Sequence, residues 1–315
     1  MDDYSKILSE ISDKKNLIVF AGAGIPTTTG LPTWIDLLKR LKAKIEDDFF
    51  SKDVEKASES EFPQLAQEIY EGFVAKHGDS GREKYLEALR EILTPTNWSH
   101  NACQLTILDT FKHIVTTNFD STFEKAIEAY GRLKNAEIPF QRHSLPIIDN
   151  SCFIQHERNL VYLHGNLADN VILRKEDYER YYNSENHTLL DFLKPIYKKS
   201  CLVFIGFSFN DLYFRKILTE IYSAIEKEDS SNKEFFSSCT GKASCIQHYA
   251  FLKDNATKHD TEKESFDSLC RELESIKIKV LKYKEHRDYE GWLNKVSDLK
   301  ELKSASQLPW SPENG

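Results

Sequence analysis

Two glycines lie close together directly after the first strongly apolar run of the chain. Residues 17–20 (Leu-Ile-Val-Phe) are followed by Gly22, Ala23 and Gly24, and a helical pattern begins near Trp34. Glycine lets a backbone turn tightly and approach a ligand closely, and the first turn of the next helix offers unpaired N–H donors that suit a pyrophosphate. The segment is a candidate phosphate site. A tight strand-to-helix connection without a ligand explains it equally well.

A second polar segment, Thr-Thr-Asn-Phe-Asp, ends the apolar run that begins at residue 113. The side chains of Asn118 and Asp120 have the chemistry to contact ribose hydroxyls or to hold a water molecule. Ser121 and Glu124 also fit a helix capping box, in which case Asp120 only helps to start a helix. That alternative does not account for Asn118.

Two more candidate loops follow later strands. His164 and Gly165 come after a buried strand at 160–163, where a histidine is placed to act as a general base. A single histidine is also compatible with a purely structural role. Gly206 and Ser208 follow the run at 202–205 and offer a turn, a hydroxyl and backbone donors.

The segments that must position these residues alternate between apolar runs and helical patterns. Runs as apolar as these are typical of strands covered on both faces, and alternation with helices indicates an α/β fold with a doubly wound, Rossmann-like parallel sheet. Ligands bind such sheets at the carboxyl ends of the strands, where all four loops lie. The predicted strands are 17–20, 113–117, 160–163, 202–205, 249–252 and 278–281.

Other segments depart from this alternation. Residues 35–111 contain helical patterns without a convincing strand and are predicted to form a helical insertion or subdomain. The polar stretch at about 226–246 is predicted to be a mobile loop, and a last helix is expected over about 288–302. The whole is predicted to be one domain over residues 1–303, with a loose tail at 304–315.

Composition excludes several classes of protein. The formal net charge of −8 argues against a protein that grips nucleic-acid backbones, and no direct nucleic-acid binding is expected. The longest apolar stretch, residues 17–25, is too short to span a membrane, and the acidic N-terminus has no apolar segment behind it. We therefore expect a cytoplasmic protein. The six cysteines are widely spaced, without any Cys-x-x-Cys pair, so no zinc ribbon and no metal site are expected.

The four loops in this order resemble the sirtuin family, and more closely its prokaryotic branch in anti-phage defence proteins. The resemblance covers roughly residues 10–290 and includes His100 and the stretch from Asp177 to Leu193. It implies that NAD+ is the substrate, that His164 is the base, and that Asn118 positions a water molecule or the ribose hydroxyls. The remaining NAD+ contacts implied by the resemblance are Gly22, Ala23, Gly24, Thr28, Thr117, Asp120, Gly206, Phe207 and Ser208.

Departures from the family pattern refine the expected reaction. Pro26 stands where the family usually has a serine, and Thr33-Trp34-Ile35 stands where classical deacylases have Asp-Phe-Arg. No segment resembles the one that classical members pair with an acyl-lysine peptide. The resemblance therefore implies hydrolysis of NAD+ to nicotinamide and ADP-ribose, depleting cellular NAD+ on activation.

Two other functions remain open at this stage. One is NAD-dependent protein deacylation, and the other is a non-catalytic module that binds NAD+ or ADP-ribose within a larger complex. Because an NAD+-depleting activity must be controlled, the resemblance also implies a homo-oligomer, an activating partner such as a ring ATPase, or both.

Overall fold

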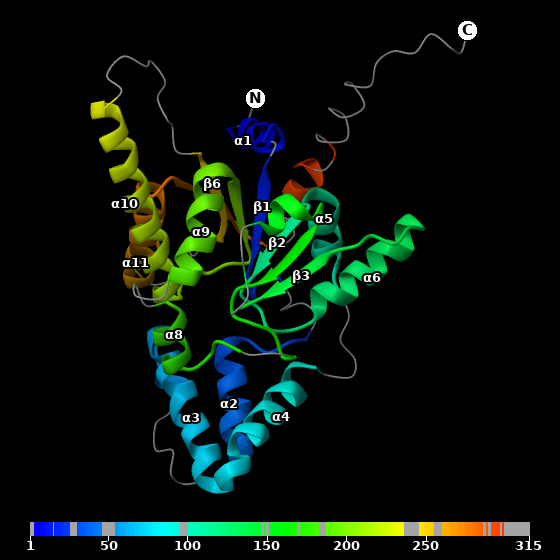
Figure 1. The fold of residues 1–315 in the computed structure, drawn as a ribbon, viewed down its shortest axis with the longest axis vertical. Coiled ribbons are helices and arrows are strands. Elements are labelled where there is room, and N and C mark those ends of the chain that lie inside the picture. Colours follow the sequence, from blue (N-terminus) through cyan, green and yellow to red (C-terminus); the bar gives the residue numbers. More distant parts are fainter. Residues whose placement is uncertain are drawn as a thin grey trace.

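In the part of the chain that the structure describes, seven parallel strands form one sheet in the order β3-β4-β2-β1-β5-β6-β7 (Figure 1). This computed structural model describes residues 3–14, 16–25, 30–45, 54–94, 100–145, 148, 151–168, 171–182, 187–235, 246–254, 260–285, 288, 291–296 and 298. The strands are β1 (Leu17–Ala21), β2 (His113–Thr116), β3 (Gln141–Ser144), β4 (Asn159–Tyr162), β5 (Cys201–Ile205), β6 (His248–Lys253) and β7 (Ile278–Tyr283).

Helices cover both faces of the sheet, which confirms the doubly wound α/β prediction. Along β1, Ile18 and Phe20 face one buried cluster, whereas Leu17, Val19 and Ala21 face the other. The first cluster includes residues of α8 (Lys175–Tyr181), α9 (His187–Lys199), α10 (Leu212–Phe235) and α11 (Asp260–Ser275). The second includes residues of α1 (Asp3–Ser12), α5 (Ala102–Thr110) and α6 (Thr122–Lys134). A central strand buried on both faces carries no polar side, so its residues read as one apolar run.

Three helices form a separate layer beyond one end of the sheet, beside α8 (Figure 1). They are α2 (Trp34–Ile45), α3 (Phe62–His77) and α4 (Gly81–Leu93), connected in part by short 3-10 turns at Val54–Lys56, Glu59–Glu61 and Gly78–Ser80. Their apolar faces share a core of their own, which also takes in Val171 and Leu173. This is the helical subdomain expected within residues 35–111, except that α5 packs on the sheet and belongs to the main layers.

Two elements of the structure, one edge strand and one short helix, were not predicted from the sequence. The edge strand β3 was missed because its residues, Gln-Arg-His-Ser, carry no apolar signal and are only partly buried. The short helix α7 (Cys152–Gln155) precedes β4. All six predicted strands are present, with ends shifted by one or two residues.

The prediction of a loop beginning at about residue 226 is wrong for its first half. Helix α10 continues to Phe235, and Glu228 pairs with Lys194 and Lys198 of α9, the latter at 3.2 Å. Asp229 adds a contact of 3.4 Å to Lys198. Charged residues without an intervening glycine or proline are compatible with a helix, so polarity alone was a misleading sign of a loop. Residues 236–245 lie outside the described residues.

The C-terminal prediction is supported only in part. Residues 291–296 are helical, as expected for a last helix over 288–302, and the tail from 304 lies outside the described residues. None of the helices in the described ranges is long and apolar enough to cross a membrane.

Candidate functional site

The two glycine loops meet where the order of the strands reverses. The chain passes from β1 to β2 on one side of the sheet and later from β4 to β5 on the other side of β1. The Gly22 N–H donates to the Ile205 carbonyl at 2.9 Å, and the Gly24 N–H donates to the Gly206 carbonyl at 2.8 Å. Such a reversal leaves a crevice outside the carboxyl ends of the strands, where open α/β sheets bind ligands.

Close backbone packing explains why these positions are glycines. A Cβ atom at Gly22 would lie 2.4 Å from the Gly206 oxygen, and one at Gly24 would lie 2.9 Å from the Gly206 Cα. Gly206 has a φ of +63°, and a Cβ there would lie 2.7 Å from the Ile25 nitrogen. Glycine is therefore required here for contact between the two loops, a reason that differs from the tight strand-to-helix connection considered for the sequence.

Asn118 ties the loop after β2 to the loop after β1. Its side chain is buried, and its Nδ2 donates to the Gly22 carbonyl at 3.2 Å. Thr116 supports it, because the Thr116 Oγ1 donates to the Ala21 carbonyl and accepts the Asn118 N–H at 3.1 Å. The amide of Asn118 is thereby held at the crevice, and Thr117 beside it is partly buried.

Asp120 is occupied at the start of α6. Its Oδ1 accepts the Thr122 N–H at 2.9 Å and the Thr122 hydroxyl at 2.5 Å. Burial raises the pKa of Asp120, and the hydrogen bonds from Thr122 oppose that shift. The predicted capping box is wrong, since Ser121 makes no side-chain cap bond and Glu124 accepts from the Tyr162 hydroxyl at 2.5 Å instead.

Asp120→Ala is expected to destabilise the protein by about 1–2 kcal/mol, because a buried N–H and a hydroxyl at the first turn of α6 would lose their acceptor. Ser121→Ala is the matched control and should change the free energy of unfolding by less than about 0.5 kcal/mol. Urea denaturation of both variants measures the difference. Equal losses in the two variants would contradict the assignment of Asp120 as the residue that starts α6.

His164 lies in a closely packed group of aromatic rings. It is 5% exposed, its ring stacks near Phe119 with centroids 6.4 Å apart, and its Nε2 lies 2.6 Å from the Tyr182 hydroxyl. Burial lowers the pKa of His164, and the Asp211 carboxylate, 3.7 Å from Nε2, opposes that shift. A buried imidazole of lowered pKa is neutral near pH 7 and so able to accept a proton.

Two partners of His164 were missed by residue-by-residue reasoning. Tyr182 directly follows α8 and lies within residues 177–193, a stretch that the family resemblance includes without giving a role to any single residue. Asp211 directly precedes α10. The Asp211 Oδ1 accepts the Phe214 N–H at 3.0 Å, and its Oδ2 accepts the Tyr178 hydroxyl at 3.1 Å. In a sequence, an aspartate directly before a helix is typical of an ordinary N-cap. Nothing in the sequence therefore indicated that Asp211 also lies close to His164.

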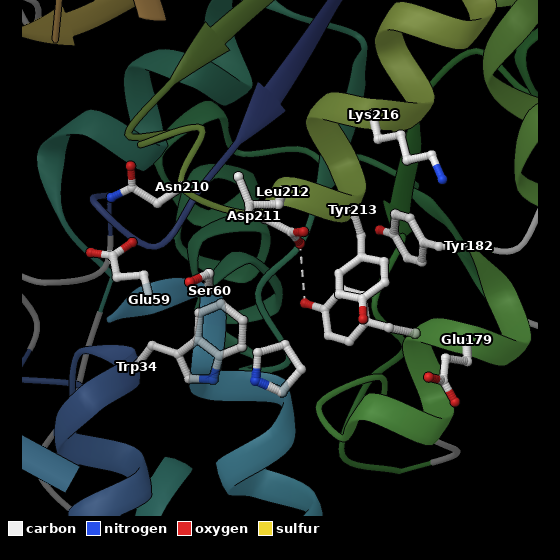
Figure 2. A pocket seen from close by; sticks show the side chains of 12 residues that line it. Trp34, Glu59, Ser60, Glu179, Tyr182, Asn210, Asp211, Leu212, Tyr213 and Lys216 are labelled. Atoms are coloured by element: carbon white, nitrogen blue, oxygen red, sulfur yellow. Dashed lines mark hydrogen bonds between the residues drawn. The ribbon is translucent and has the colours of Figure 1, made fainter. Parts of the chain in front are cut away.

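A cavity of about 410 Å³ opens beside these partners (Figure 2). Tyr178, Tyr182 and Asp211 form part of its wall, together with Tyr213 and, from the helical layer, Trp34 and Glu59. Within this wall the Tyr178 hydroxyl donates to the Asp211 carboxylate, and Figure 2 draws this bond as a dashed line that ends at Asp211. The residues that line the cavity do not include His164, Asn118 or the loop glycines. Tyr182 and Asp211 line it and also lie next to His164, so they connect the cavity to the proposed base.

The remaining predicted contacts have differing environments. Ala23 and Ser208 are exposed, and the Ser208 Oγ accepts the Asn210 N–H at 3.3 Å. The Phe207 side chain packs in the core with ring centroids 5.0 Å from Phe209, so only its backbone is free to face a ligand. Thr28 lies outside the described residues.

Metal binding has no counterpart in the described part of the chain, where no group of three or more His, Cys, Asp or Glu side chains is placed to hold an ion. Four cysteines are buried and are not part of a disulfide: Cys103, Cys152, Cys201 and Cys270. The expectation that the protein lacks zinc stays a prediction.

Comparison with known proteins identifies a family whose sequence pattern this chain matches. A family model described as a SIR2-like domain matches residues 112–281, more than half of the chain. The chain is 25% identical to an NAD(+) hydrolase ThsA of Cytobacillus dafuensis over 87% of its own length and 51% of the relative's. It is 24% identical to defense-associated sirtuin 2 of Bacillus subtilis over 73% of its own length and 21% of the relative's.

The chain thus spans about half of the first relative and about a fifth of the second. Among solved structures, a Sir2 homologue mutant in complex with ADP-ribose aligns over 99% of this chain and 100% of its own, with 15% identity and a TM-score of 0.41.

Proposed function

This chain belongs to the SIR2-like domain family, and we propose that it hydrolyses the nicotinamide–ribose bond of NAD+ as an effector of anti-phage defence. The names of its relatives support this reaction and setting: NAD(+) hydrolase for several and defense-associated sirtuin for another. NAD+ is the proposed substrate, and no metal is required by the proposed chemistry.

The observation that carries the proposal is the meeting of the Gly22–Gly24 loop with Gly206 at the strand reversal, with the Asn118 amide held against it. The Gly22 and Gly24 N–H groups are bound to the Ile205 and Gly206 carbonyls. These glycines are therefore proposed to let the pyrophosphate of a dinucleotide approach closely, and other backbone N–H groups of the crevice to bind it. Gly22, Ala23, Gly24, Gly206 and the backbone of residues 207–208 are the proposed NAD+ contacts. Thr28 and Thr117 stay proposed contacts on the resemblance alone.

The proposed chemistry uses water as the acceptor. The bond from the ribose anomeric carbon to the pyridinium nitrogen breaks, and nicotinamide leaves with the electron pair as a neutral molecule. The site therefore needs little acid catalysis and instead must stabilise a positively charged ribose and direct a water molecule to it. Asn118 is proposed to orient the water or the ribose hydroxyls, and His164 to take up the proton released. Asp120, occupied by Thr122, is proposed to act through the shape of the loop.

We expect the purified protein, alone or with its activator, to convert NAD+ to free nicotinamide and ADP-ribose in equal amounts. Liquid chromatography of the reaction products measures both. Formation of an acylated ADP-ribose only when an acylated peptide is present would contradict hydrolysis and indicate a deacylase. NAD+ binding without any product, in the presence of the cell extract from infected bacteria, would indicate a binding module.

Control of the activity is part of the proposal. A homo-oligomer or an activating partner, such as a ring ATPase, is expected. A constantly active NAD+ hydrolase would exhaust the NAD+ of the cell that makes it.

A further inference from the structure

The hydrogen bond between Tyr182 and His164 determines which ring nitrogen carries the proton. Burial raises the pKa of Tyr182 well above its usual value, so the phenol keeps its proton. Within the described residues, that proton has no acceptor other than His164 Nε2, 2.6 Å from the hydroxyl. The hydroxyl is therefore assigned as the donor and Nε2 as the acceptor. A neutral imidazole whose Nε2 accepts carries its own proton on Nδ1.

Asp211 provides a negative charge on the same side of the ring. Its Oδ2 lies 3.7 Å from Nε2, too far for a hydrogen bond but close enough for a strong electrostatic interaction in a buried site. The carboxylate is fixed by the Phe214 N–H and by the Tyr178 hydroxyl. Among the described residues, three titratable groups face the His164 ring: Tyr178 in α8, Tyr182 directly after α8, and Asp211 directly before α10. The apolar ring of Phe119 stacks against it.

We propose that Tyr182 and Asp211 are positioning residues for His164: Tyr182 selects the Nδ1–H tautomer, and Asp211 stabilises the imidazolium that forms when Nε2 takes up a proton. This deepens the proposed function and rests on it. One proton moves from water or a ribose hydroxyl to Nε2, and the imidazole becomes cationic. The Tyr182 hydroxyl rotates so that its oxygen accepts the new N–H, and its own proton turns to the oxygen that gave up the proton. Both residues act through His164.

The tautomer is tested by NMR of the full chain labelled with ¹⁵N-histidine, without any turnover. The His164 signals are identified by their loss in His164→Gln. We expect a protonated Nδ1 and an unprotonated Nε2 near pH 8, and a mixture of both tautomers in Tyr182→Phe. Tyr213→Phe is the matched control, because Tyr213 lines the same cavity and stacks on Tyr178 without bonding to His164. A wild-type Nε2–H tautomer, or no change in Tyr182→Phe, would overturn the role of Tyr182.

The charge effect is tested with Asp211→Asn, whose amide oxygen keeps an acceptor for the Phe214 N–H and preserves the start of α10. Burial lowers the pKa of His164 and Asp211 raises it, so loss of the carboxylate must lower the pKa further. The acid limb of the kcat/KM profile for NAD+ should move to lower pH by about one unit. Tyr182→Phe should lower kcat about 3- to 10-fold with KM unchanged. An Asp211→Asn profile that superposes on the wild type would overturn the role of Asp211.

The two kinds of measurement separate this inference from the proposed function. A wild-type chain with the expected tautomer but no NAD+ cleavage under any activating condition contradicts the proposed hydrolysis, while the positioning of the ring stands. An active chain whose His164 tautomer is the same in Tyr182→Phe contradicts the positioning, while hydrolysis stands.

Discussion

His164→Ala should lower the turnover of NAD+ about 10²–10⁴-fold, the usual contribution of one general acid–base group. The affinity for NAD+ should change by no more than a few fold. The reason is geometric, because the loop contacts between Gly22, Gly24 and Gly206 do not involve His164. Turnover measured by product chromatography, beside calorimetric NAD+ affinity, gives the two quantities separately.

Removal of this buried ring also leaves a gap among Phe119, Tyr178 and Tyr182, so thermal unfolding must confirm that the variant is folded. His156→Ala is the matched control, since His156 is exposed and precedes β4 at the opposite end of the strand. If folded His164→Ala keeps full activity, His164 is a structural residue and the proposed mechanism is wrong.

Asn118 is a less selective target than His164 for the same question. Its Nδ2 holds the Gly22 carbonyl, so Asn118→Ala removes a loop contact as well as a group at the crevice. Equal losses of binding and turnover in that variant would assign Asn118 to NAD+ binding and loop structure, with no contribution specific to the chemical step.

Gly206→Ala should destabilise the protein by about 2–4 kcal/mol. A non-glycine residue at a φ of +63° costs about 1 kcal/mol or more, and a Cβ 2.7 Å from the Ile25 nitrogen adds an overpacking cost of about 1–3 kcal/mol. Because the contact is with backbone, no side-chain rotation relieves it. Urea denaturation measures the loss of free energy of unfolding.

Gly30→Ala is the matched control for this substitution. Gly30 has a φ of +86°, but no atom of the described residues lies within 4 Å of its Cβ position. It therefore tests the backbone conformation alone and should cost about 1 kcal/mol. If the two variants lose the same stability, the contact between the glycine loops contributes nothing, and the explanation given for Gly22, Gly24 and Gly206 fails.

The sequence was sufficient for features encoded by local periodicity. Strand β1 reads as an apolar run because Ile18 and Val19 are covered on opposite faces by separate helical layers. The order of such runs and of glycine turns predicted a doubly wound sheet and placed Asn118 and His164 at strand ends. The polar edge strand β3 could not be found in this way, since its pairing with β4 depends on backbone hydrogen bonds and leaves no apolar pattern.

Contacts between distant segments were decided by the tertiary structure alone. The sequence determined that glycines follow β1 and β5, but only the adjacency of these strands makes each loop the obstacle to a side chain in the other. The sequence likewise offered His164 as a base, while the folded chain brings Tyr182, directly after α8, and Asp211, directly before α10, to the same ring nitrogen. Spacing along a chain reports which residues share an element. Which elements touch depends on how the whole chain buries its apolar surface, and that sets the surroundings of His164.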